Sequence, residues 1–179
     1  MKTMVISAHP CLEQSRANQA MSRELKRYED ISFRDLYAEY PDWTIDVKHE
    51  QNLLLQVDRV VLQFPFYWYS SPPLLKKWLD DVLTYGWAFG SGGDNLKGKE
   101  FIIATTAGGT ENSYRAGGEN LYTVSEMLRP IERTLTKCGI TYLPAFVTYN
   151  ANAGSESYLA EEAIRYAAYI HEPSEALVL

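Results

Sequence analysis

Residues 59–83, with the sequence RVVLQFPFYWYSSPPLLKKWLDDVL, contain the patterns of a strand, a loop and a helix in immediate succession. Residues 59–64 form a short apolar run with β-branched side chains, which is typical of a buried strand. The sequence SSPP at residues 70–73 offers an N-cap hydroxyl followed by prolines in the first turn, which predicts a helix start. The helix carries apolar side chains on one broad stripe and charged side chains opposite. We therefore expect it to cover one face of a sheet.

The same alternation of strands and helices extends toward both ends of the chain. We expect the other strands at residues 2–8, 31–37, 100–107 and 140–149. Further helices are expected at residues 15–27, 49–57, 121–138 and 156–170. Pro144 within the last strand indicates an edge position or an irregularity. Five strands that alternate with helices predict right-handed βαβ units, hence a parallel sheet with helices on both faces.

The composition places the chain among globular proteins. Its 179 residues fit one domain, and 46% hydrophobic with 22% charged residues argues against disorder. Because no linker or internal repeat interrupts the pattern, we expect a single domain over residues 1–179. A net charge of −6 argues against a nucleic-acid groove or a polybasic membrane patch.

The cellular setting is indicated by the N-terminus and by the cysteines. The first residues, MKTMVISAHP, turn polar too soon for a signal peptide, and no apolar run approaches the roughly 18 residues of a spanning helix. The two cysteines, Cys11 and Cys138, are far apart and have no metal-ligand spacing. We expect a cytoplasmic protein without a metal site.

Three loops are candidates for a functional site, since ligands of open α/β sheets bind outside the carboxyl ends of the strands. These loops are residues 9–18, 65–70 and 105–109, and they should converge in space. The first brings the N-terminus of a helix together with the donors His9, Ser15, Arg16 and Asn18. That combination is typical of an anion site, most naturally one for phosphate.

The other two loops favour a flat ring. Residues 66–69 are all aromatic, and Gly108 and Gly109 have no side chain to keep a ligand away from the backbone. Phosphate at one end and a flat heteroaromatic at the other describe a mononucleotide cofactor such as FMN. The chain has neither the G-x-G-x-x-G of a dinucleotide site nor the G-x-x-x-x-G-K-[ST] of a P-loop.

Each of these residues also has a structural interpretation. Ser15 can be an N-cap only, Phe66 and Trp68 can be core aromatics, and Gly108 with Gly109 can form a simple turn. For His9 taken alone, a structural and a functional role are equally supported. The functional interpretation is favoured because all of these residues fall on one predicted rim of the sheet.

The motifs H-P-x5-R-A-N (residues 9–18), F-P-x-x-W-Y-S-x-P-P-L-L-K-x-W (64–78) and T-x-G-G (106–109) resemble the NAD(P)H:quinone reductase (DT-diaphorase) family. The likeness covers nearly the whole chain. It is strongest to the bacterial YwrO-type (general stress protein 14) oxidoreductases, and KefF-type ancillary subunits of potassium efflux systems share the motifs. The resemblance implies a flavodoxin-like three-layer sandwich with the strand order 2-1-3-4-5.

The resemblance also implies roles for individual residues. The flavin phosphate would be held by His9, Ser15, Ala17 and Asn18. The isoalloxazine would be cradled by the loop of Pro65, Phe66, Tyr67, Trp68 and Tyr69. Its other edge would be lined by Thr106, Ala107, Gly108 and Gly109. Tyr114 matches the catalytic tyrosine of the family and would also contact the cofactor.

The chain departs from the family in three places. Ala107 stands where the family usually has a second threonine, and Asn120 stands near the histidine that partners the tyrosine in the animal enzymes. The C-terminal extension that grips the adenine half of FAD is absent. FMN is therefore favoured over FAD.

The expected function is the two-electron, ping-pong reduction of quinones or similar small electrophiles, with NAD(P)H as co-substrate and FMN as cofactor. The resemblance also implies a homodimer with the pocket at the interface. A one-electron flavodoxin carrier is less consistent with the chain, because the loop HPCLEQ is not the Ser/Thr/Gly-rich phosphate loop of such proteins. The alternative that stays open is a KefF-like regulatory subunit associated peripherally with a potassium efflux transporter.

Overall fold

One sheet of parallel strands forms the centre of the computed structural model, which describes residues 1–177. The strands follow the order β2-β1-β3-β4-β5, and a sixth strand, β6, also pairs with β4. Their bounds are β1 Thr3–Ser7, β2 Ile31–Asp35, β3 Arg59–Pro65, β4 Glu100–Thr106, β5 Thr141–Tyr142 and β6 Phe146–Thr148. The expected strand order 2-1-3-4-5 is confirmed.

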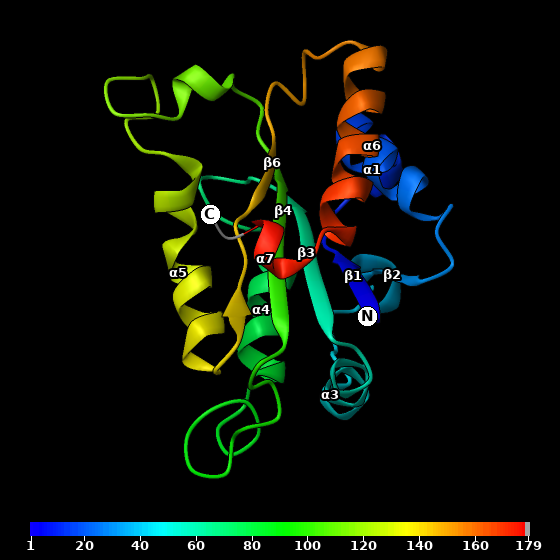
Figure 1. The fold of residues 1–179 in the computed structure, drawn as a ribbon, viewed down its shortest axis with the longest axis vertical. Helices are drawn as coiled ribbons and strands as arrows, with labels where there is room; N and C mark the ends of the chain where they lie inside the picture. Colours follow the sequence, from blue (N-terminus) through cyan, green and yellow to red (C-terminus); the bar gives the residue numbers. More distant parts are fainter. Residues whose placement is uncertain (178–179) are drawn as a thin grey trace.

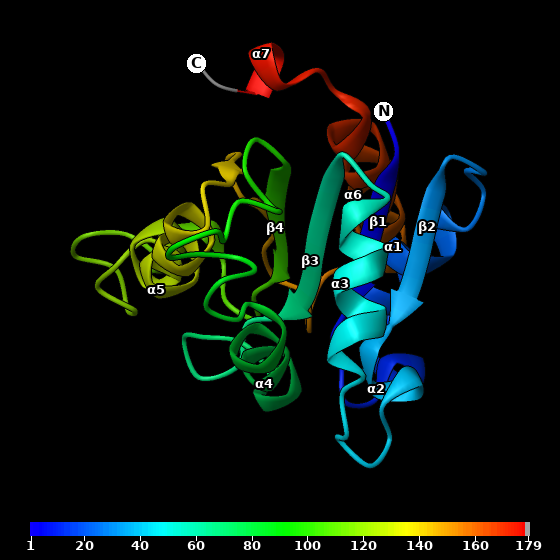
Figure 2. The same ribbon diagram turned by 90° about the horizontal axis from the view of Figure 1, so that it is seen from below.

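Helices cover both faces of the sheet, as Figures 1 and 2 show. Helices α1 (Arg16–Leu25) and α6 (Glu156–His171) pack on one face, and α3 (Val47–Leu55), α4 (Pro73–Val82) and α5 (Val124–Lys137) pack on the other. Two short helices, α2 (Leu36–Glu39) and α7 (Ser174–Leu177), and the 3₁₀ turns η1 (Leu12–Gln14) and η2 (Glu111–Ser113) complete the described elements.

The pleat of the strands explains why a nearly continuous apolar sequence forms two cores. In β1, Met4 and Ile6 point into the core under α3, α4 and α5, whereas Val5 points into the core under α1 and α6. A strand that is buried on both faces is apolar along most of its length. Residues 59–64 of β3 follow this pattern, except that two polar residues, Arg59 and Gln63, are buried with the others. Within residues 1–177, no helix has the length and apolar character needed to cross a bilayer.

Two expected strands differ from the structure at their ends. The strand expected at residues 31–37 ends at Asp35, because the Asp35 carboxylate accepts hydrogen bonds from the N–H groups of Tyr37 and Ala38 and thereby starts α2. The strand expected at residues 140–149 is divided by Pro144 into β5 and β6. Both pieces pair with the same side of β4, β5 at its start and β6 at its end.

The start of α4 corrects one expectation. No serine hydroxyl caps this helix: Pro72 is the N-cap residue, and Ser70 lies in the preceding turn. Proline at the first helical position has no N–H to satisfy. The N–H of the second residue, Leu74, donates to the hydroxyl of Tyr37 at 3.5 Å in place of a serine cap.

A buried carboxylate links β2, α3, α4 and the segment after α2. Glu50 of α3 accepts hydrogen bonds from Arg34 of β2 at 2.7 and 2.8 Å, from the hydroxyl of Tyr40 at 2.6 Å and from the indole of Trp78 in α4 at 2.8 Å. Burial, followed by the contact with Glu50, raises the pKa of Tyr40 to about 12, so this phenol stays a donor. The network fixes the segment that follows β2 against α4.

Candidate functional site

A cavity of about 640 Å³ lies at the carboxyl ends of the strands. The structure brings the loops after β1, β3 and β4 together around it. A fourth loop, after β6, completes the wall, and in Figure 1 it lies with the loop after β4 at the upper edge of the sheet. The lining residues are His9, Cys11, Gln14, Ser15, Arg16, Ala17, Asn18, Pro65, Phe66, Tyr67, Thr106, Gly108, Ala151 and Asn152.

The N-terminus of α1 forms one end of this cavity. Ser15 is the N-cap residue, and its hydroxyl accepts the N–H of Asn18 at 3.2 Å. The N–H groups of Arg16 and Ala17 have no acceptor anywhere in residues 1–177. Unpaired N–H groups of a first helical turn favour an anion, because the helix dipole adds positive potential at the same place.

Asn18 is held in one orientation by buried partners. Its side-chain nitrogen donates to Thr106 Oγ1 at 2.8 Å, and only 1% of the residue is exposed. On the side of the sheet, Gln63 of β3 supports Asn18. Its Nε2 lies 3.4 Å from Asn18 Oδ1 and donates to Ser22 Oγ at 3.2 Å. The amide oxygen of Asn18 thus faces the protein and its NH2 group faces Thr106 at the cavity wall.

His9 is neutral in its own surroundings. The N–H of Cys11 donates to His9 Nδ1 at 3.0 Å, so this nitrogen carries no proton and Nε2–H is the free donor. Burial is the largest influence on the ring and lowers its pKa below the usual value, although the negative charge of Asp35 acts in the opposite direction. The ring meets that of Tyr67 edge-on, with the two centroids 6.2 Å apart.

The aromatic loop folds into a tight turn at residues 67–70. The N–H of Ser70 donates to the carbonyl of Tyr67 at 3.0 Å, and both central residues, Trp68 and Tyr69, have positive φ angles of 47° and 63°. Such angles cost a non-glycine residue on the order of 1 kcal/mol. The Trp68 side chain is 91% exposed, and neither Trp68 nor Tyr69 lines the cavity. Within the described part of the chain, their backbone N–H groups have no acceptor.

The two glycines of the third loop are crowded by different neighbours. A Cβ on Gly108 would lie 2.9 Å from Asn152 Nδ2, and one on Gly109 would lie 2.6 Å from Ser113 Oγ. Gly108 lines the cavity and Gly109 does not. Ala107 also lies outside it: its side chain is buried, and its N–H donates to the carbonyl of Thr148 at 2.8 Å.

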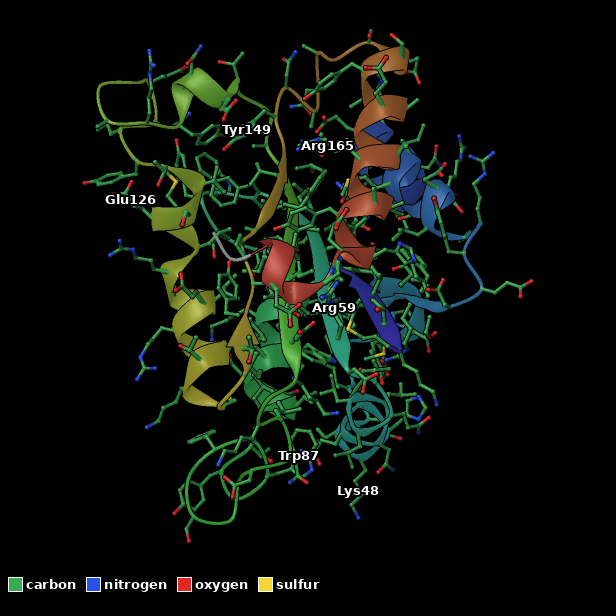
Figure 3. All side chains as sticks on the ribbon, viewed as in Figure 1. Lys48, Arg59, Trp87, Glu126, Tyr149 and Arg165 are labelled. Atoms are coloured by element: carbon green, nitrogen blue, oxygen red, sulfur yellow. The ribbon has the colours of Figure 1, made fainter. Side chains whose placement is uncertain are left out.

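Tyr114 lies beside the main cavity, in the wall of a second one of about 470 Å³. Its ring packs between Phe66 and Tyr149, with centroid distances of 6.0 and 5.8 Å. Figure 3 shows Tyr149 at the upper end of β6, next to the loop that follows β4. Burial raises the pKa of Tyr114, so its hydroxyl keeps its proton at neutral pH. Asn120 does not reach this hydroxyl and donates to Ser113 Oγ at 3.3 Å instead.

Several residues around the cavity were not singled out from the sequence. Gln63 and Arg59 are the two polar residues within the apolar run 59–64, and such an exception is a usable signal for a buried polar role. Ala151 and Asn152 follow the fifth predicted strand, so the rule that ligands bind at the carboxyl ends of strands applies to them equally. Arg16 was expected to bind the anion, but its guanidinium contacts Glu156 and the loop after β6.

The chain matches the family model described as flavodoxin-like fold over residues 1–170. General stress protein 14 of Bacillus subtilis (strain 168) is 50% identical over 97% of this chain and 99% of the relative. The glutathione-regulated potassium-efflux system ancillary protein KefG of Serratia proteamaculans (strain 568) is 40% identical over 96% of this chain and 94% of the relative.

Solved structures show the same fold. A structure described as a thermophilic tryptophan halogenase from Streptomycin violaceusniger has a TM-score of 0.93 at 52% identity and covers 95% of this chain and 99% of its own. General stress protein 14 from Treponema denticola in complex with FMN has a TM-score of 0.92 at 40% identity, covering 99% of both chains. An NADPH-quinone reductase from P. pentosaceus has a TM-score of 0.88 at 32% identity, covering 97% of this chain and 99% of its own.

Proposed function

The chain belongs to the flavodoxin-like fold family, and on that premise we propose that it is an FMN-dependent NAD(P)H:quinone oxidoreductase. One observation carries the proposal: the unpaired N–H groups at the start of α1 and the aromatic residues Phe66 and Tyr67 line one cavity at the edge of the sheet. The resemblance to an FMN-bound general stress protein 14 and to an NADPH-quinone reductase supports it.

The donors at the N-terminus of α1 fit a phosphate group. The N–H groups of Arg16 and Ala17 have no other acceptor in residues 1–177, and the hydroxyl of Ser15 and the NH2 group of Asn18 lie beside them. These donors are neutral, and the helix dipole supplies the positive potential. We propose that they hold the FMN phosphate together with His9, whose Nε2–H is free to donate.

The loops after β3 and β4 fit a flat ring system. Phe66 and Tyr67 line the cavity, and the turn leaves the N–H groups of Trp68 and Tyr69 unpaired. Gly108 also lines the cavity, and a Cβ there would press on the Asn152 side chain in the opposite wall at 2.9 Å. We propose that this wall receives the isoalloxazine. When bound there, FMN supplies the two-electron redox chemistry that links NAD(P)H to a quinone.

The side chains around the ring have separate tasks. The aromatic residues exclude water and orient the ring, and the positive-φ turn fixes where its N–H groups point. Tyr114 holds a proton on its hydroxyl and can donate a hydrogen bond to an oxygen that gains negative charge. We propose Tyr114 as the catalytic residue. It would act without a histidine partner, because residue 120 is an asparagine whose side chain donates to Ser113 instead.

Steady-state kinetics test this function. Initial rates measured against NAD(P)H at several quinone concentrations should give parallel double-reciprocal plots, because both substrates use the same place beside the cofactor in turn. Intersecting lines would mean that both substrates are bound together, and an inactive FMN-loaded protein would refute the activity itself.

The assembly and location are part of the proposal. Exposed aromatic side chains of Tyr67, Trp68 and Tyr69 surround the rim of the cavity, and a second copy of the chain would cover them. We therefore propose a homodimer with the pocket at the interface, to be checked by sedimentation velocity. Cys11 and Cys138 are both free, which supports a reducing compartment such as the cytoplasm.

A second candidate function is a regulatory role at a potassium efflux transporter. The 40% identity to KefG over nearly the whole chain favours it. The two functions are compatible, since a flavin-binding subunit can also dock on a membrane protein. Co-purification of a potassium efflux protein from membranes that contain the tagged chain would support this role. If no efflux protein co-purifies in repeated experiments, the regulatory role is refuted and only the oxidoreductase activity is proposed.

A further inference from the structure

Arg16 is the first residue of α1, but its guanidinium faces the loop between β6 and α6. It donates from Nε and Nη2 to Glu156 Oε1 at 3.0 and 2.8 Å, from Nη1 to the carbonyl of Asn152 at 3.1 Å and from Nη2 to the carbonyl of Gly154 at 2.9 Å. Four of the five N–H donors of the group are thereby used, and the charge of Arg16 is balanced by Glu156.

The loop that Arg16 holds has a fixed base. The N–H of Asn150 donates to the carbonyl of Gly109 at 2.8 Å, and that of Ala151 donates to the carbonyl of Ala107 at 3.0 Å. Ala151 is buried against Ala17 and Leu159. These bonds tie the start of the loop to the loop after β4. Across the tip, residues 152–154, the N–H of Gly154 donates to the carbonyl of Asn150 at 2.8 Å, but none of these bonds holds Asn152 itself.

The tip of this loop forms part of the cavity wall. Asn152 lines the cavity and its Nδ2 lies where a Cβ on Gly108 would be only 2.9 Å away. In the described residues, the amide of Asn152 has no hydrogen-bond partner, so Arg16, which grips the Asn152 carbonyl, is the contact that keeps this side chain over Gly108.

We propose that Arg16 is a positioning residue that closes the fourth wall of the cavity by holding residues 152–154, and that it does not bind the phosphate. Asn152 then presents its amide to the ring side of the cavity, next to Gly108. The inference rests on the proposed FMN site, and it divides the first turn of α1 into two roles. The backbone of the turn faces the anion, and the Arg16 side chain faces away from it.

The carbonyl contacts matter more than the ion pair. The side chains of Arg16 and Glu156 are 43% and 86% exposed, and exposed ion pairs contribute little. Replacing Glu156 should therefore loosen the tip less than replacing Arg16, which removes the bonds to both carbonyls.

Binding of two ligands separates a positioning role from a phosphate contact. Dissociation constants for FMN and for riboflavin, which lacks the phosphate, would be measured by flavin fluorescence for Arg16→Ala, Arg16→Lys and Glu156→Gln. The control is Arg27→Ala, which removes an exposed arginine, paired with Glu24, from the other end of the α1 segment. We expect Arg16→Ala to weaken both ligands by a similar factor, about tenfold. Arg16→Lys should weaken both ligands nearly as much as Arg16→Ala does. Glu156→Gln should have a smaller effect in the same direction, and Arg27→Ala should bind both ligands like the wild type.

A phosphate contact would give the opposite pattern. Arg16→Ala would then weaken FMN but not riboflavin, Arg16→Lys would keep most of the FMN affinity, and Glu156→Gln would strengthen FMN binding by freeing the guanidinium. That result would overturn the proposal.

Hydrogen exchange of the cofactor-free protein provides a test without flavin. Arg16→Ala should speed exchange of the Gly154 amide, which donates to the carbonyl of Asn150, by about tenfold relative to the wild type and to Arg27→Ala. Unchanged exchange at the tip would overturn the role of Arg16 even if FMN binds. If Arg16→Ala speeds exchange of the Gly154 amide but the wild-type protein binds no FMN, the proposed function is refuted and the role of Arg16 in holding the loop is still supported.

Discussion

Asn18 is the residue at which the anion site and the sheet meet, through its bond to Thr106 and its support from Gln63. Replacing Asn18 with Ala should weaken FMN binding by about 1–3 kcal/mol, because a buried donor to a charged phosphate is lost. Riboflavin should bind the variant nearly as well as the wild type. Isothermal titration with the two ligands measures both effects, and an equal loss for riboflavin would exclude Asn18 as a phosphate ligand.

Tyr114 can be tested without disturbing its packing between Phe66 and Tyr149. Tyr114→Phe keeps the ring and removes only the hydroxyl, so FMN content should stay unchanged. Turnover should fall about ten- to a hundredfold, which corresponds to roughly 1.4–2.7 kcal/mol. Stopped flow measures the rate of flavin reduction by NAD(P)H and the rate of its reoxidation by quinone separately. We expect only one of these two rates to fall. Equal rates to the wild type in both would leave Tyr114 with a packing role only.

At the scale of residues, the sequence was informative about backbone positions and less so about side-chain directions. His9, Ser15 and Asn18 could be placed at the cavity because the end of a strand and the start of a helix are visible in the pattern. The direction of the Arg16 side chain, toward Glu156, could not be predicted. Glu156 lies 140 positions away in the chain, and no local rule relates the two residues. Asn152 could have been found by applying the strand-end rule to the fifth strand.

The aromatic turn after β3 shows strain at the scale of an element. Trp68 has a φ of 47° but is 91% exposed, so glycine at this position would relieve the backbone and lose little packing. Trp68→Gly should raise the free energy of unfolding by up to about 1 kcal/mol and weaken FMN binding. Chemical denaturation of the cofactor-free protein measures the first effect.

The matched control for this turn is Tyr122→Gly, since Tyr122 is also an exposed loop aromatic but is not among the residues with positive φ. There glycine should lower the free energy of unfolding by about 0.5–1 kcal/mol, because only the unfolded chain gains freedom. If the two variants were equally destabilised, the turn would hold no strain to relieve.

The helices and strands could be predicted where the apolar pattern continues over many residues. Their ends were harder to predict. The central strands β1, β3 and β4 follow from continuous apolar runs. The end of β2 was missed because Asp35 acts as an N-cap that competes with strand extension. The division into β5 and β6 at Pro144 was indicated by the missing N–H of proline. The serine cap expected for α4 is absent because Pro72 takes the N-cap position and the hydroxyl of Tyr37, distant in sequence, accepts the N–H of Leu74.

The buried Glu50 network acts at the scale of the whole molecule, since it joins β2, α3 and α4 and the segment after α2. Glu50→Gln should lower the free energy of unfolding by about 3 kcal/mol or more, because it leaves the buried Arg34 with only the half-exposed Glu39, 3.6 Å away, as a counter-charge. The control, Asp80→Asn, removes the acceptor of Lys76 in an ion pair on α4 that is exposed on both sides, and should cost about 1 kcal/mol or less. Equal midpoints in urea for both variants would contradict the structural role of Glu50.

The arrangement of the whole sheet was predictable because handedness and burial leave few choices for strands that alternate with helices. The strand order itself came from resemblance to a family and not from periodicity, since patterns of single strands carry no information on their neighbours. The cavity then follows from the topology, because β1 and β3 lie side by side and their loops diverge to opposite faces.

The most direct test of the central claim is the visible absorption spectrum of the purified protein under nitrogen, after reconstitution with FMN and removal of unbound flavin. We expect the yellow band of bound FMN, its loss when NADH or NADPH is added, and its return when a quinone follows. Protein that retains no FMN at micromolar concentrations, or bound FMN whose band neither nucleotide removes, would contradict the account.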